Sequence, residues 1–322
     1  MNNARSNNQI VLNVNEIAKN YDEFEALTGL SFEVRAGEIV GLLGPNGAGK
    51  TTAIRILTTI LPASRGHFSV MDVPDSQPEK IRALIGVLPE SNGFPMHMNG
   101  VDFLTYMGQL YGQARDEANQ KALDLLRLFG LERAAQVRIA TYSRGMKQRL
   151  AIARSLINDP KVLFLDEPTL GFDPKGQKEM LDVISKAAEE SRVAVILSSH
   201  LLEVVEAICD RVIILHHGRM ISAGSVADIK QQVSVPHTCR IQMPSASIPA
   251  AISALSTLAG VTAQHPKNHK DELIVSMNGM SNGSQMNTVL QQLIQANIPI
   301  EGFTKDTGRL SDAFLSMIEE VR

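Results

Sequence analysis

A glycine-rich octapeptide is the stretch of the chain whose residue types and spacing most clearly indicate chemistry. Residues 44–51 read Gly-Pro-Asn-Gly-Ala-Gly-Lys-Thr and match the pattern G-x-x-x-x-G-K-[ST] at every fixed position. Glycines in such a loop let consecutive backbone N–H groups converge on a polyphosphate, helped by the N-terminus of a following helix. Lys50 is expected to reach the outer phosphates, and the Thr51 hydroxyl to help hold Mg²⁺. The residues expected to bind a nucleoside triphosphate here are Gly44, Pro45, Asn46, Gly47, Ala48, Gly49, Lys50, Thr51 and Thr52.

Two adjacent carboxylates, Asp166 and Glu167, end a second apolar run. The four residues before them, Val162–Leu165, predict a strand buried on both faces, and open α/β sheets place their sites at the C-terminal ends of such strands. Because side chains alternate along a strand, the two carboxylates should point differently. Asp166 can then serve the Mg²⁺ shell while Glu167 polarises a water. Either residue alone could be a surface acidic strand end, but the pair beside a phosphate loop favours catalysis.

Five further residues have a structural interpretation on local sequence alone, and for all of them except Asp173 a functional one is open as well. Tyr21 lies between two predicted strands and could stack on a base or be a half-buried loop tyrosine. Ser143 and Gly145 begin a predicted helix, where they could bind an anion or where Ser143 could simply cap the helix. Asp173 in isolation is a turn aspartate. His200 follows a predicted strand and could donate to a γ-phosphate, or it could cap or pack.

Composition bounds the class of protein. A length of 322 residues predicts about two domains, and 44% hydrophobic with 20% charged residues is typical of a soluble globular protein. The net charge of −3 gives no support for a nucleic-acid binder. Cys209 and Cys239 are far apart in sequence and indicate neither a disulfide framework nor a metal cluster, so both are expected to be buried in a reducing cytosol.

The ends and apolar runs of the chain predict a cytosolic protein. Residues 1–9 are polar, are expected to be flexible, and lack the apolar region of a signal peptide. The longest apolar runs, such as Val193–Leu197, are strand-sized and far shorter than a membrane span. Any role at a membrane is therefore expected to come through a partner.

The elements that must position these residues form an α/β pattern over residues 10–230. Residues 10–35 alternate as an antiparallel strand pair, and residues 101–158 are mostly helical. Helices are predicted at residues 51–61, 78–84, 101–112, 117–129, 145–158 and 175–190, and further strands at 85–88, 162–166, 193–197, 211–215 and 219–223.

A second module follows a predicted linker at residues 231–237 and occupies residues 238–322. Its pattern gives strands at 238–243, 260–264, 272–277 and 298–303, with helices at 249–258, 285–296 and 310–321. The order βαββαβ with a final helix predicts a small α+β, ferredoxin-like domain. The module contains no motif that carries chemistry, and its sequence does not indicate its role.

With these motifs in place, residues 10–230 resemble the nucleotide-binding subunit of an ATP-binding cassette (ABC) transporter. Gly44–Thr51 is similar to the Walker A motif, Leu163–Glu167 to Walker B with its catalytic glutamate, and Tyr142–Gln148 to the signature region. The resemblance assigns Asp173 to the D-loop, His200 to the switch histidine and Tyr21 to the adenine-stacking aromatic. The second module resembles the extension on many subunits that pair with ABC-2-type, often export-directed, permeases.

The chain departs from the family's common pattern at two places. Glu90 stands where the family usually has glutamine; other export-group members also have Glu here, and its carboxylate can still coordinate Mg²⁺. The common signature is Leu-Ser-Gly-Gly-Gln, whereas residues 142–146 read Tyr-Ser-Arg-Gly-Met. The phosphate-facing Ser143 and Gly145 are kept, and Arg144 and Met146 differ.

The resemblance implies a P-loop NTPase cassette, with a mixed sheet, an antiparallel β-subdomain and a helical subdomain. It implies an ATPase in which two ATP molecules, with Mg²⁺, lie between two copies of the chain. One copy would supply Lys50, Thr51, Asp166, Glu167 and His200, with Glu167, His200 and Lys50 catalytic. The other would supply Ser143 and Gly145. Thr51, Asp166 and Glu90 would be the metal ligands.

The implied partner is a separate multi-pass permease at the cytoplasmic face of the membrane, with export as the expected direction. The loop at residues 90–100 and the helical region near it are the expected contact. One alternative is a soluble ABC protein acting on ribosomes or nucleic acid, but such factors usually carry two cassettes. The other is a regulatory cassette with weak turnover, which Glu90 and Arg144 would suit and the intact Lys50, Glu167 and His200 disfavour.

Overall fold

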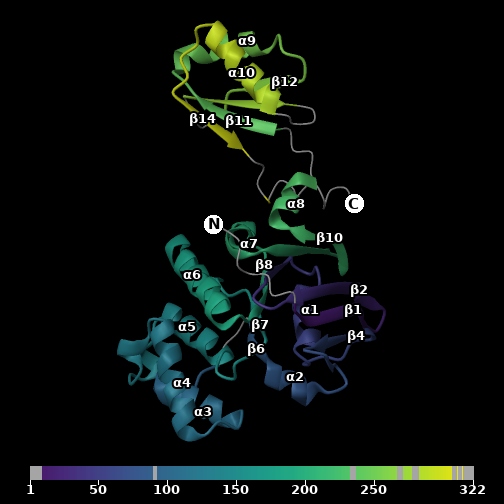
Figure 1. Cartoon of the computed structure of the whole chain (residues 1–322), viewed down its shortest axis with the longest axis vertical. Helices are drawn as coiled ribbons and strands as arrows, with labels where there is room; N and C mark the ends of the chain where they lie inside the picture. Colours follow the sequence, from purple (N-terminus) through teal and green to yellow (C-terminus); the bar gives the residue numbers. More distant parts are fainter. Residues whose placement is uncertain are drawn as a thin grey trace. The chain divides into compact units, whose positions relative to one another are not determined.

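The computed structural model describes residues 9–89, 93–232, 237–266, 271–277 and 283–306, together with residues 310 and 314 (Figure 1). The chain divides into two compact units, Met1–Val226 and Ala227–Arg322. Helix α8 (Val226–Gln232) begins at this boundary, so residues 231 and 232 are helical and do not form the predicted linker. Residues 233–236 of that linker, and nearly all of the expected flexible N-terminus, lie outside the described residues. Within the described chain, none of the helices is both long enough and apolar enough to span a bilayer.

The first unit contains an antiparallel sheet with the strand order β2-β1-β4-β5. Alternation places Leu12 and Val14 in the core, as the period of the sequence predicts, and a shift in register between Val14 and Ile17 brings Ile17 into the core as well. The strands are β1 (Ile10–Tyr21), β2 (Phe24–Arg35), β4 (Arg65–Val70) and β5 (Val73–Pro74).

A six-stranded sheet with the order β10-β9-β3-β8-β7-β6 is the centre of this unit. Strand β3 runs parallel to both β8 and β9, and β7 runs parallel to β8 and β6, whereas β9 and β10 form an antiparallel hairpin. Every residue of β3 and β7 is buried, which explains why both strands are continuous apolar runs. The strands are β3 (Ile39–Leu43), β6 (Ile85–Leu88), β7 (Val162–Asp166), β8 (Ala194–Ser199), β9 (Arg211–His216) and β10 (Arg219–Ser225).

Helices surround these sheets, and α3, α4 and α5 gather in a helical region apart from β1, β2 and β4 (Figure 1). The predicted helical character of residues 101–158 is confirmed, with short 3₁₀ turns at Glu132–Ala134 and Ile139–Thr141. The helices are α1 (Lys50–Leu57), α2 (Pro78–Leu84), α3 (Gly100–Leu110), α4 (Arg115–Leu128), α5 (Arg144–Ser155), α6 (Pro174–Ser191) and α7 (Leu202–Ile208).

Helix α1 ends four residues earlier than predicted, at Leu57 and well before Pro62. The Thr58 hydroxyl donates to the backbone oxygen of Ile54 at 2.7 Å, and Thr59 has a positive φ of 61°. The local side-chain bond and the left-handed residue stop the helix before proline can.

The second unit has the order β11-α9-β12-β13-α10-β14 that the sequence predicts, and all strand pairs in its sheet, β12-β13-β11-β14, are antiparallel. Cys239, Ile241, Leu273 and Val275 are among the residues of its own core. The last strand begins at Gly302, later than predicted, and most of the predicted helix 310–321 lies outside the described residues. The elements are β11 (His237–Gln242), α9 (Ile248–Leu255), β12 (Val261–Gln264), β13 (Glu272–Met277), α10 (Gly283–Gln295) and β14 (Gly302–Asp306).

Candidate nucleotide-binding site

The glycine-rich loop connects the end of β3 to the start of α1, as the sequence predicts. Gly49 is the N-cap residue of α1 and has a φ of +104°. A Cβ atom at this position would lie 2.9 Å from the backbone oxygen of Ala26 and 2.8 Å from Leu27 Cδ2. Only glycine fits both the left-handed conformation and the close approach of β2. A larger residue at position 49 would therefore displace the loop at the start of α1.

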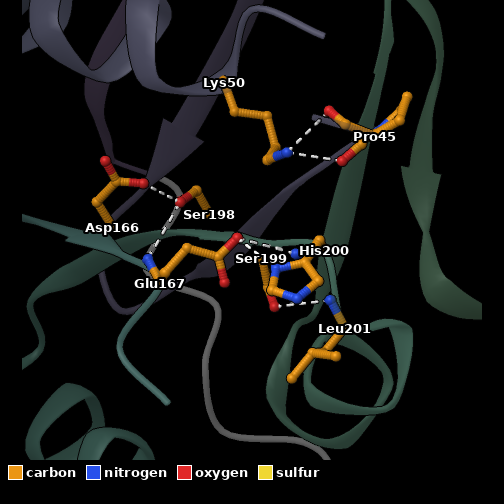
Figure 2. A network of polar contacts seen from close by, with 9 residues as sticks. Pro45, Lys50, Asp166, Glu167, Ser198, Ser199, His200 and Leu201 are labelled. Carbon is orange, nitrogen blue, oxygen red and sulfur yellow. Dashed lines mark hydrogen bonds and ion pairs between the residues drawn. The ribbon is translucent and has the colours of Figure 1, made fainter. Parts of the chain in front are cut away.

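Lys50 lies with its ammonium turned back into the loop. Its Nζ donates to the backbone oxygen of Gly44 at 2.6 Å and to that of Pro45 at 3.1 Å (Figure 2). The residue is only 8% exposed. Burial lowers the pKa of Lys50, and the negative charges of Glu167 and Asp166 partly oppose that shift. The ammonium is thus held beside the loop at which phosphates are expected.

Ser198, at the end of β8, connects the carboxylate of Asp166 to the backbone of Glu167. Its hydroxyl donates to Oδ1 of the buried Asp166 and accepts a hydrogen bond from the backbone N–H of Glu167 at 3.2 Å (Figure 2). Glu167 has a positive φ of 48°, so the chain turns sharply after Asp166. This turn sends the two side chains in different directions, which is the divergence that the sequence predicts.

Glu167 is held against His200. Its Oε1 atom accepts a hydrogen bond from the backbone N–H of His200 at 3.1 Å and lies 2.9 Å from the ring Nδ1 (Figure 2). Its Oε2 atom is buried and has no hydrogen-bond partner among the described residues. A carboxylate fixed through one oxygen, with lone pairs left on the other, can accept a proton from a water molecule.

These side chains share one pocket of about 430 Å³. The loop, both carboxylates and His200 line it, and so does Tyr21, which is the last residue of β1 and lies beside the turn. The pocket is formed by Tyr21, Phe24, Ala26, Asn46, Gly47, Ala48, Gly49, Lys50, Thr51, Thr52, Asp166, Glu167, Leu170 and His200.

Ser143, Gly145 and Asp173 do not line this pocket. The Ser143 hydroxyl caps α5 by accepting from the N–H of Met146 at 3.2 Å, and Asp173 caps α6 through the N–H of Gly176 at 3.1 Å. Ser143 therefore has the capping role that the sequence allowed, whereas Asp173, interpreted from the sequence as a turn aspartate, is the N-cap of α6. Contact of either residue with a nucleotide stays a prediction. Glu90, the third expected metal ligand, lies outside the described residues.

Sequence reasoning did not find four residues of the site: Phe24, Ala26 and Leu170, which line the pocket, and Ser198, which supports Asp166. Phe24 is 66% exposed and is the direct partner of Tyr21 in the β1–β2 register, so the hairpin pairing was the signal that could have found it. Ser198 was visible as a polar residue at the end of a buried strand, but its bond to Asp166 spans 32 residues of sequence.

The residues present fit a magnesium ion. The Thr51 hydroxyl and the Asp166 carboxylate line the same pocket, and both offer the oxygen ligands that Mg²⁺ prefers. The described residues contain no group of three or more His, Cys, Asp or Glu side chains that could hold a metal alone. Mg²⁺ is commonly bound through one or two protein oxygens together with water and substrate phosphates, which is the kind of site that Thr51 and Asp166 could complete.

Comparison with known sequences agrees with this chemistry. Residues 27–170 match the family model described as "ABC transporter". The daunorubicin/doxorubicin resistance ATP-binding protein DrrA of Streptomyces peucetius is 32% identical over 305 residues, which cover 94% of this chain and 90% of that protein. The linearmycin resistance ATP-binding protein LnrL of Bacillus subtilis is 35% identical over 220 residues, covering 68% and 70%.

Solved structures give the same result for about two thirds of the chain. The ATP-binding subunit of an ABC transporter is 31% identical, with a TM-score of 0.62, over 69% of this chain and 92% of that one. CbiO1 from Clostridium perfringens, described as part of the ABC transporter complex cbiONQ, is 28% identical, with a TM-score of 0.64, over 69% and 91%. Together with the P-loop site, these likenesses show that this chain belongs to the ATP-binding proteins of ABC transporters, a family of P-loop ATPases.

Proposed function

We propose that two copies of this chain bind and hydrolyse ATP between them, and that the cycle drives export through a separate membrane permease. The observation that supports this most directly is the single pocket shared by Lys50, Thr51, Asp166, Glu167 and His200. It brings together a phosphate loop, two oxygen ligands for Mg²⁺ and a carboxylate base. The export direction is supported by the similarity to DrrA and LnrL, which are named as resistance proteins.

In the proposed reaction, Glu167 Oε2 accepts a proton from water while the water oxygen bonds to the γ-phosphorus. The bond from that phosphorus to the β,γ-bridging oxygen breaks, which gives ADP and phosphate. Lys50 exchanges its two carbonyl partners for phosphate oxygens and stabilises their charge. His200 keeps the base oriented through Oε1. Mg²⁺, held by Thr51 and Asp166, would supply further charge neutralisation on the phosphates.

The second copy is proposed because the signature residues lie outside the chain's own pocket. Ser143 and Gly145 mark the N-terminus of α5, where backbone N–H groups and the helix dipole favour an anion. A second copy could offer this helix start to the nucleotide that the first copy holds in its phosphate loop. Two equivalent sites would result, each made by both copies.

The permease contact is proposed on α3 and the loop before it. Large apolar side chains are exposed there, namely Met96, Tyr106, Leu110 and Tyr111. Tyr106 and Leu110 are four residues apart on α3 and so lie on one face of it, which makes that face a candidate interaction surface. The subunit would lie at the cytoplasmic face of the membrane through this contact, as expected from the resemblance.

Glu167→Gln tests the assignment of the base. The amide preserves size and hydrogen-bonding capacity but cannot take the proton, so we expect ATP binding to stay within a factor of about two and hydrolysis to fall by roughly 100-fold or more. Light scattering should then detect an ATP-dependent dimer. The matched control is Glu203→Gln, an exposed glutamate on α7. Turnover in Glu167→Gln equal to that of the control would contradict the assignment.

The permease is tested by purification from membranes under mild detergent. We expect a multi-pass membrane protein to co-purify with the wild-type chain and to be lost when Tyr106 and Leu110 are changed to Asp. Retention of ATP binding in the double variant would show that its fold survives. Recovery of the wild-type chain without any membrane protein, from cells that carry its neighbouring genes, would contradict the transport role.

A further inference from the structure

Arg144 connects the start of α5 to the wall of the nucleotide pocket in the same chain. It is the first residue of α5, directly after the cap Ser143, and it stands where the common signature has glycine. Its Nη2 atom donates to the backbone oxygen of Leu170 at 2.9 Å. Leu170 lines the pocket, so the arginine contacts the backbone of a residue that faces the nucleotide.

The absence of a side chain at Gly171 leaves room for the guanidinium of Arg144. A Cβ atom at Gly171 would overlap the guanidinium of Arg144, and the φ of Gly171 is +78°. One helical turn further on, Gln148 Nε2 donates to the backbone oxygen of Pro168 at 3.0 Å. Residues four apart lie on the same face of a helix, so Arg144 and Gln148 hold neighbouring carbonyls from one face of α5.

The segment that α5 holds in this way begins directly after the base. The N–H of Leu170 donates to the backbone oxygen of Glu167 at 3.1 Å, and the N–H of Phe172 donates to that of Thr169 at 3.2 Å. The segment is therefore a series of hydrogen-bonded turns that ends at Asp173, the cap of α6. A displacement of α5 would be transmitted through Leu170 to the backbone that carries Glu167.

We propose that Arg144 is a positioning residue that couples the two ATP sites of the dimer. This inference rests on the proposed function, which places the start of α5 at the partner's nucleotide. When that nucleotide binds, α5 is fixed, and Arg144 in turn fixes the Leu170 carbonyl and the Glu167 backbone in its own pocket. The base in one site is then placed correctly only when the other site is filled.

The test compares Arg144→Ala and Arg144→Lys with Arg133→Ala, which removes an exposed arginine from the same helical region. Since small displacements of a catalytic group cost roughly 10- to 100-fold in rate, we expect kcat of Arg144→Ala to fall by about 10-fold. KM and the affinity for a fluorescent N-methylanthraniloyl-ATP should stay within about twofold. The Hill coefficient for ATP should fall to about 1. Lysine, whose ammonium can still donate to the Leu170 carbonyl, should recover part of kcat.

The possible results separate this coupling role from direct binding of the nucleotide and from the absence of any role. A rise in KM with kcat unchanged would show that Arg144 binds the nucleotide itself, and would overturn the proposal. A value of kcat and a Hill coefficient equal to those of Arg133→Ala would overturn it as well. A wild-type protein that hydrolyses ATP without cooperativity would contradict the dimer on which both proposals rest. Retained wild-type cooperativity in Arg144→Ala would contradict only the role of Arg144.

Discussion

Lys50 is a buried charge whose hydrogen-bond acceptors, within the described part of the chain, are two backbone oxygens. Its pKa is lowered from 10.5, chiefly because burial penalises the ammonium. Between the lowered pKa and 10.5 the unfolded chain binds more protons at this residue than the folded chain does, so the free energy of unfolding rises with pH across that window. At neutral pH, below this window, the charged lysine therefore lowers the free energy of unfolding. Its expected role in binding phosphates explains why a charge is present there in spite of that cost.

Lys50→Met should accordingly stabilise the ligand-free protein while abolishing nucleotide binding. Because burial of the ammonium carries a desolvation cost that an apolar side chain does not, we expect a gain of about 1 kcal/mol in the free energy of unfolding at neutral pH. The gain should shrink as the pH is raised, since wild-type Lys50 then loses its charge. Urea unfolding and ATP calorimetry measure both effects. Lys178→Met, at an exposed lysine, is the control, and a marked destabilisation of Lys50→Met would contradict the argument.

Ser198 should matter for turnover as well as for stability, since its hydroxyl joins Asp166 to the backbone of Glu167. Ser198→Ala leaves a buried carboxylate oxygen without its donor, and we expect a loss of about 1–3 kcal/mol in the free energy of unfolding. We also expect Mg²⁺ to stimulate ATP hydrolysis less strongly and kcat to be lower. The matched control is Ser155→Ala, another buried serine whose hydroxyl donates to a carbonyl, that of Ile152 at 2.7 Å. It should lose stability without a change in kcat; equal kcat values in the two variants would contradict the role of Ser198.

At the scale of elements, the β1–β2 hairpin presents two aromatic side chains to the pocket. Tyr21 and Phe24 are direct partners across a two-residue turn, and they are 42% and 66% exposed. The ammonium of Lys19 lies 5.4 Å from the centroid of the Tyr21 ring. Exposed rings at the rim of this pocket are suited to stack on the base of a nucleotide. Stacking uses the face of the base and so does not depend on which hydrogen-bonding groups its edge carries.

Phe24→Ala tests this role of the hairpin. Since base–aromatic stacking is worth about 1–3 kcal/mol, we expect the affinity for ATP to fall by roughly 5-fold or more, while tripolyphosphate, which has no base, binds as before. Competition with a fluorescent nucleotide measures both. Ile60→Ala removes an exposed apolar side chain outside the pocket and should change neither affinity. An equal loss of ATP and tripolyphosphate affinity in Phe24→Ala would place its effect on the phosphate loop instead of the base.

The elements that the sequence predicts well are those governed by local patterns. The buried strands β3 and β7 follow from continuous apolar runs, and the loop before α1 follows from its glycines, so Lys50, Asp166 and Glu167 could be placed at one sheet edge in advance. The end of α1 could not, because a threonine hydroxyl decides it. The Ser198 bond to Asp166 and the place of Phe24 at the pocket depend on tertiary pairing, which no local period encodes.

At the scale of the whole molecule, each compact unit has a hydrophobic core of its own. The first core combines both sheets of the cassette with α1, and the second is built around Cys239, Ile241 and Leu273. Units with separate cores can unfold separately. The nucleotide pocket is lined entirely by residues of the first unit. A ligand should therefore stabilise that unit directly.

The two cysteines can report this division, because one lies in each unit. Burial raises the pKa of Cys239 to about 11 and that of Cys209 further still, so neither thiol should react in the native protein. In urea, each should become alkylated as its own unit unfolds, with two midpoints resolved by peptide mass spectrometry. Saturating ATP with Mg²⁺ at about 100 times its dissociation constant adds roughly 2.7 kcal/mol to a unit that binds it. We expect the Cys209 midpoint to rise and the Cys239 midpoint to stay.

Lys50→Met provides the control for this shift, since it should keep the fold but lose the ligand. Its Cys209 midpoint should then not respond to ATP, which separates binding from any general effect of the nucleotide on urea unfolding. A rise of both midpoints by the same amount in the wild-type chain would mean that the two units unfold as one cooperative body. In that case ATP binding would stabilise the second unit together with the first. A rise in the urea midpoint of Cys209 alone would mean that ATP binding leaves the stability of the second unit unchanged.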